Sequence, residues 1–95
     1  MELTKTSGSE TFMSNLNGYD VTASFKYDAD GKVTQVWDGV VRNENRTLAN
    51  YNIFYQPNGE FSKNYNFYSL DIDKEKEVTG IISEFVSKAI SEVNL

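Results

Sequence analysis

The chain contains no cysteine, no histidine and only one proline among its 95 residues. Without cysteine it can form no disulfide framework, no thiolate zinc site and no thiol nucleophile. Without histidine it lacks the side chain that most often serves as a general base near neutral pH. We therefore predict that the protein is not an enzyme and that it uses no cofactor.

A metal site is also not expected. The carboxylates of Asp28 and Asp30 invite a calcium interpretation, but an EF-hand loop counted from Asp28 would need Gly and Glu where the chain has Val33 and Gly39. The segment Asp28-Ala29-Asp30-Gly31 instead fits the tip of a hairpin, in which Asp begins the turn and Gly takes the left-handed position.

Long apolar runs are missing as well. No stretch approaches the roughly 18 apolar residues of a membrane-spanning helix, and no basic patch followed by an apolar run marks a signal peptide. We expect no membrane partner and a cytoplasmic location. A secreted or periplasmic protein whose signal peptide has been removed would have the same sequence.

The formal net charge of −5 comes from 14 acidic and 9 basic residues, and it is unevenly distributed. Residues 71–95 hold six acids against three bases, whereas residues 19–70 are nearly balanced, with six acids and five bases. A balanced region offers no basic surface for the neutralisation of phosphates, so the charge argues against a nucleic-acid partner.

The pattern of residues predicts one α+β domain over residues 10–95, preceded by a flexible segment at residues 1–9. Short alternating segments between residues 11 and 70 are separated by turn signals, of which Asn17-Gly18 and Pro57-Asn58-Gly59 are the clearest. We expect an antiparallel β-meander of four to five strands, with one C-terminal amphipathic helix packed across one face.

The helix is the strongest signal. Its apolar residues recur at spacings of three and one along a single stripe, and Asp73 is expected to cap its start. The stripe consists of Val78, Ile81, Ile82, Phe85, Val86, Ala89, Ile90 and Val93.

The strand over residues 32–42 requires one irregularity. Alternation places Val33, Gln35 and Trp37 on the helix side, and Val40 should face the same way if it pairs with Ala49. An extra residue must then be absorbed, and we expect a bulge at Asp38-Gly39. Lys63 is also predicted to lean toward the helix side, with its ammonium group in water at a sheet edge.

Two similar segments, NYNIFY at residues 50–55 and NYNFYS at residues 64–69, flank the Pro57 turn. The turn predicts that Asn50 faces Asn66, that Tyr51 faces Tyr65 and that Asn52 faces Asn64. The tyrosines would lie under the helix with Ala49, Ile53, Tyr55, Phe61 and Phe67. The opposite face would carry the four asparagines with Leu48, Phe54 and Tyr68, and with Thr22, Ser24, Lys26, Thr34 and Val36 across the sheet.

This amide and aromatic face is the candidate binding site, formed by Asn50, Asn52, Phe54, Asn64, Asn66 and Tyr68. Such a face is wettable and could simply meet solvent, yet Asn is disfavoured in strands. Amides and aromatics are typical of protein interfaces, sugar sites and single-strand stacking platforms. We predict a small interaction or regulatory module that binds an unknown protein partner or a second copy of itself. The alternative is a domain that binds a glycan or single-stranded nucleic acid on the same face.

Overall fold

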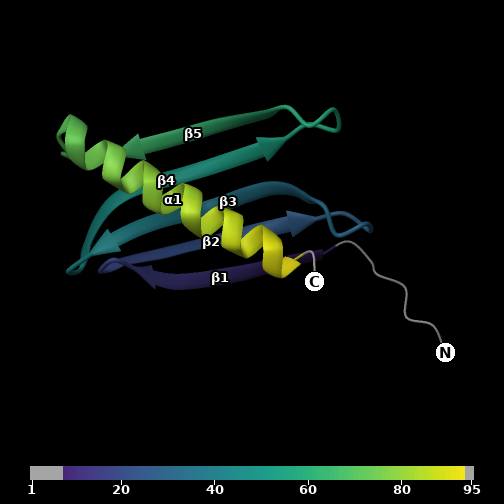
Figure 1. Cartoon of the computed structure of the whole chain (residues 1–95), viewed down its shortest axis with the longest axis horizontal. Coiled ribbons are helices and arrows are strands. Elements are labelled where there is room, and N and C mark those ends of the chain that lie inside the picture. Colours follow the sequence, from purple (N-terminus) through teal and green to yellow (C-terminus); the bar gives the residue numbers. More distant parts are fainter. Residues whose placement is uncertain (1–7, 94–95) are drawn as a thin grey trace.

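The structure, a computed structural model, describes residues 8–93 of the chain. Within this range the chain forms five strands and one helix, and the strands make one antiparallel sheet in the order β1-β2-β3-β4-β5. The elements are β1 (Gly8–Leu16), β2 (Tyr19–Tyr27), β3 (Val33–Asn43), β4 (Arg46–Tyr55), β5 (Phe61–Phe67) and α1 (Ile72–Val93). Figure 1 shows α1 crossing one face of the sheet diagonally. This arrangement confirms the predicted α+β meander.

Of the segment predicted to be flexible, residues 1–7 lie outside the described range, and β1 begins at Gly8. The tight turns after β1 and before β5 follow the sequence signals. Asn17 and Gly18 both have positive φ, at 54° and 86°, as a two-residue hairpin loop requires. Gly59 has a φ of 90° and donates its N–H to the carbonyl of Gln56 at 3.0 Å.

The two hairpins with clear turns have the predicted register. In the first, Leu16 pairs with Tyr19 and Phe12 pairs with Ala23. In the second, β4 and β5 bring the two NYN segments together, since Asn50 pairs with Asn66 and Asn52 pairs with Asn64. The turn residues therefore determine which side chains share a face.

Val33 is buried on the helix side as predicted. The predicted faces of Gln35, Val36 and Trp37 are wrong, because β3 carries two irregularities instead of one. The bulge at Asp38 is present, with a φ of 53°. A second shift near Thr34 separates the pair Tyr27 and Val33 from the pair Lys26 and Gln35. It moves Val36 to the helix side, where it is fully buried, and turns Gln35 and Trp37 to the opposite face.

The predicted pairing at the start of β4 is also wrong, because a second bulge lies between β3 and β4. Ala49 pairs with Val41, not with Val40, and the next pair joins Thr47 to Arg42. Leu48 is the extra residue of this bulge, and it is buried in the core instead of lying beside the asparagines. Val40 consequently faces away from α1, opposite Asn50.

Helix α1 starts at Ile72, and its cap is Asp71, not the predicted Asp73. The Asp71 Oδ1 atom accepts the N–H of Lys74 at 2.7 Å, as an N-cap does. The apolar stripe of α1 is buried as predicted, apart from Ile90, which is half-buried. The helix packs most closely on β1, β2 and β3, so Phe61 on β5 lies on the helix side but remains 54% exposed.

Candidate interaction surface

We call the face of the sheet opposite α1 the outer face. The six predicted site residues all lie on it, near the β4–β5 edge. Asn50 is half-buried, and the other five are exposed, with Phe54 at 50% and Tyr68 at 44%. The structure thus brings together the full predicted set: Asn50, Asn52, Phe54, Asn64, Asn66 and Tyr68.

One internal hydrogen bond orders this set. Asn50 donates from Nδ2 to the hydroxyl oxygen of Tyr68 at 2.7 Å, which holds the tyrosine ring over the sheet. The side-chain amides of Asn52, Asn64 and Asn66 make no hydrogen bond with any other residue of the range 8–93. Each of these amides therefore offers two donors and a carbonyl acceptor to an incoming surface.

The apolar residues of the outer face differ from those predicted, since Val36 and Leu48 are buried in the core instead. Trp37 and Val40 join it as half-buried residues, and Met13 on β1 is 77% exposed. Trp37 lies on this face because of the bulge at Thr34. No residue type in that segment predicts a bulge. The sequence does show a tryptophan next to the Asp38-Gly39 bulge. It does not show on which face of the sheet that tryptophan lies.

The outer face is hollowed next to Asn50. A shallow depression of about 610 Å³ is lined by Val40, Arg42, Thr47, Asn50 and Tyr68. A second depression of about 750 Å³ continues toward Met13 and shares Val40 and Arg42 with the first. Both are open to solvent, so they suit a broad contact better than an enclosed small molecule.

Charge is sparse on this face. Among the strand residues that point to this face are the cations Lys26 and Arg42 and the carboxylate Asp20. Asp20 lies opposite Arg42 and accepts a hydrogen bond from Asn15 Nδ2 at 3.0 Å. Most of the acidic side chains of the chain lie elsewhere, in the turns and on α1. The outer face is therefore nearly neutral on an acidic protein.

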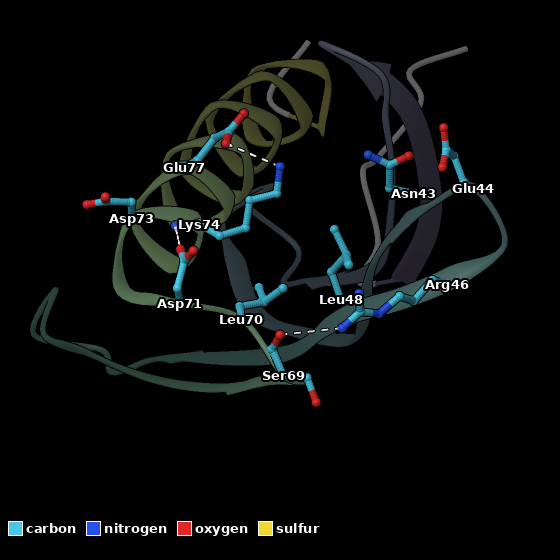
Figure 2. Close-up of a pocket in the computed structure, with 10 residues that line it drawn as sticks. All are labelled: Asn43, Glu44, Arg46, Leu48, Ser69, Leu70, Asp71, Asp73, Lys74 and Glu77. Atoms are coloured by element: carbon cyan, nitrogen blue, oxygen red, sulfur yellow. Dashed lines mark hydrogen bonds and ion pairs between the residues drawn. The ribbon is translucent and has the colours of Figure 1, made fainter.

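A cleft of about 630 Å³ lies where α1 begins, between the helix and the β3–β4 turn (Figure 2). Sequence reasoning missed it. Leu48 and Leu70 form its apolar floor. Arg46 spans one side, donating from Nη2 to the carbonyls of Tyr68 and Ser69 at 3.2 and 3.4 Å.

Four of the six charged residues of this cleft have partners within the fold, namely Arg46, Asp71, Lys74 and Glu77. Lys74 lies 5.0 Å from the ring centroid of Tyr19 and 3.4 Å from the carboxylate of Glu77. Its pKa is raised chiefly by the contact with the Tyr19 side chain and also by Glu77. Asp71 caps the helix, and Asp73 points away from the cleft. These groups stabilise the start of α1, which accounts for their placement.

The remaining titratable groups within residues 8–93 form no further site. No group of three or more His, Cys, Asp or Glu residues that could hold a metal ion occurs between Gly8 and Val93. Burial raises the pKa of the Tyr51 hydroxyl well above its usual value, with a smaller effect from Tyr65, and it also raises the pKa of Tyr55. These rings belong to the core side of the sheet. No helix in the described part of the chain is long and apolar enough to cross a membrane.

These features define an α+β domain with a helix on one sheet face and an open amide and aromatic surface on the other. Comparisons of the chain with protein-family models, with curated proteins and with solved structures find no match. The geometry of the outer face is therefore the basis for any assignment of function.

Proposed function

We propose that the chain is a small non-catalytic interaction module that binds another protein molecule through the outer face. The observation that carries this proposal is the set of unpartnered amides at Asn52, Asn64 and Asn66, placed beside the exposed rings of Phe54 and Tyr68. Side chains that serve only solubility would be long and charged. The side chains of this surface are short and rigid, and the surface is nearly neutral.

The distribution of exposed apolar side chains supports the same proposal. The large hydrophobic residues exposed in the range 8–93 are Met13, Phe54, Phe61, Tyr68 and Ile72, and three of the five lie on the outer face. Protein interfaces combine such aromatic anchors with hydrogen-bonding groups that exclude water around them. A protein surface is favoured over a nucleic acid because the paired positions of this face include only two cations and one carboxylate.

Photo-cross-linking in the cells that make the protein tests this proposal. Phe54 and Tyr68 are replaced, one at a time, by the photoreactive aromatic residue p-benzoylphenylalanine. We expect discrete protein adducts from both positions, identified by mass spectrometry. Phe61 is the matched control, because it is an equally exposed aromatic, at 54% against 50% for Phe54, on the other side of the sheet.

Adducts that form at Phe61 and at neither outer-face position would refute the proposal. A glycan or single-stranded nucleic acid on the same face is the competing interpretation. It predicts no protein adducts from Phe54 or Tyr68, but binding to a glycan array or to labelled oligonucleotides. Binding of an oligonucleotide that does not weaken as salt rises would exclude the nucleic-acid version.

A further inference from the structure

The outer face is a lattice of four rows that cross the strands, because residues opposite each other on neighbouring strands lie side by side. The first row is Ser62, Phe54, Gln35, Lys26 and Ser9; the second is Asn64, Asn52, Trp37, Ser24 and Thr11. The third row is Asn66, Asn50, Val40, Thr22 and Met13; the fourth is Thr47, Arg42, Asp20 and Asn15. Asn52 meets Trp37 because the neighbouring residues Ile53 and Val36 are paired.

These rows are chemically matched in pairs. The second and third rows both contain two amides, one apolar side chain on β3 and one hydroxyl on β2, and they differ on β1, where one has Thr11 and the other has Met13. The first and fourth rows carry opposite charges on β2, with Lys26 at one end of the strand and Asp20 at the other. A rotation that exchanges the second row with the third and the first with the fourth would therefore bring like polarity and opposite charge together.

We propose that the occupant of the outer face is a second copy of this chain, related by a two-fold axis that crosses the strands between the second and third rows. This inference rests on the proposed function and names the partner. In such a dimer the two sheets pack face to face. Asn52 meets Asn50 of the second copy, Asn64 meets Asn66, Trp37 meets Val40, and Lys26 meets Asp20. Every one of these contacts occurs twice.

A two-fold axis along β3 is the main competing arrangement for two copies. It would place Arg42 of one copy on Arg42 of the other. Lys26 of one copy would lie on the Phe54 ring of the other, with no carboxylate nearby. Like charges brought together at an interface are unfavourable. The axis across the strands avoids this contact, because Arg42 then faces the neutral amide of Gln35.

The available area is sufficient for such a dimer. Five strands spaced about 4.8 Å apart and four rows spaced about 6.6 Å apart cover roughly 600 Å² per copy, or roughly 1,200 Å² for both. That reaches the lower end of the range for specific interfaces. Stacked sheets cross at about −30°, which moves the ends of the rows by a few ångströms, within the reach of the Lys26 side chain.

Light scattering with charge reversal tests the inference. We expect the wild-type protein to reach twice the monomer mass of 10.8 kDa as its concentration rises toward about 1 mM. Asp20→Lys and Lys26→Asp should each raise the dissociation constant of the dimer about tenfold or more. The double variant should restore it, because Asp20 and Lys26 lie about 20 Å apart in one copy and can only compensate between copies.

Lys76→Glu is the control, since it changes the net charge as Lys26→Asp does but lies exposed on α1; it should leave the dimer unchanged. A wild-type chain that stays monomeric at about 1 mM would overturn the inference. So would a dimer that the double charge reversal fails to restore.

Photo-cross-linking at Phe54 and Tyr68 separates this inference from the proposed function. Adducts of two copies of the chain support both. Adducts with a different protein support the proposed function and overturn the dimer. Absence of protein adducts at both positions overturns the proposed function itself.

Discussion

The ring of Tyr51 lies directly against the backbone of Gly39 in the middle of the sheet. A side-chain carbon at position 39 would lie 2.5 Å from Cδ2 and 2.6 Å from Cγ of that ring. The tyrosine hydroxyl donates to the carbonyl of Thr22 at 3.1 Å, which fixes the far end of the ring. Because Tyr51 is almost fully buried, it cannot swing aside to admit a larger residue.

Gly39→Ala should therefore destabilise the protein, by about 1–3 kcal/mol in the free energy of unfolding, as overpacking in a core does. Urea denaturation followed by circular dichroism measures this change. Gly80→Ala is the matched control, because nothing lies within 4 Å of a side chain at that exposed helical position. It should stabilise the protein by about 0.5–1 kcal/mol. Equal effects of the two substitutions would contradict the close packing of Tyr51 on Gly39.

Stability should also fall in alkaline solution. Burial raises the pKa of Tyr51 far above the ordinary tyrosine value of 10.0, so the folded protein keeps this proton while the unfolded chain loses it. The stabilising contribution is complete below pH 10 and decreases as the pH rises further, by up to about 1.4 kcal/mol per pH unit. Tyr51→Phe should make this decline shallower and cost about 1 kcal/mol at pH 7, through loss of the hydrogen bond to Thr22.

Urea midpoints between pH 8 and 11.5, at constant ionic strength, measure both effects. Tyr55 and Tyr65 also have raised pKa values because they are partly buried, so some alkaline decline should remain in the Tyr51→Phe variant. An unchanged slope in that variant would show that Tyr51 ionises without unfolding.

The sequence predicted those parts of the fold that depend on turn chemistry. Asn17-Gly18 and Pro57-Asn58-Gly59 each allow few backbone conformations, and a two-stranded register follows from the turn. The helix was predictable because burial of one stripe imposes a period of 3.6 residues. Its cap moved from Asp73 to Asp71, since both residues can accept the N–H of the third helical residue and only tertiary packing selects one.

Bulges limited the prediction of faces. The shift at Thr34 and the extra residue at Leu48 each move one residue across the sheet, and neither contains the Gly that marked the bulge at Asp38-Gly39. A single shift exchanges every following side chain between the two faces. The asparagines were placed correctly because the regular β4–β5 hairpin carries them, whereas Trp37 and Val40 on the bulged β3 were not.

The β3–β4 turn holds a residue in an unfavourable conformation. Glu44 and Asn45 have φ values of 51° and 66°, and only the second is a residue type that tolerates the left-handed region well. Glu44→Gly should therefore stabilise the protein by about 1 kcal/mol, because it relieves the backbone strain. Thermal denaturation and urea denaturation both measure this gain. A loss of stability would mean that the Glu44 carboxylate, at the rim of the cleft beside α1, makes a contribution larger than the strain.

The asparagines of the outer face give the most direct test of what this surface is for. Asn52 and Asn64 pair across β4 and β5, are exposed, and make no side-chain hydrogen bond within residues 8–93. The double substitution of both by Thr should change the stability of the monomer by less than about 0.5 kcal/mol, because Thr suits a strand at least as well as Asn.

The same double variant should lose the adducts formed from Phe54 and Tyr68 and should weaken the dimer. Lys76→Gln, an exposed change on α1, should affect neither measurement. If the double variant at Asn52 and Asn64 keeps all binding, these amides serve only to make the face soluble in water. Loss of stability together with loss of binding would show that these amides support the sheet itself. Only binding lost at unchanged stability assigns them to an interface, since that outcome separates recognition from folding.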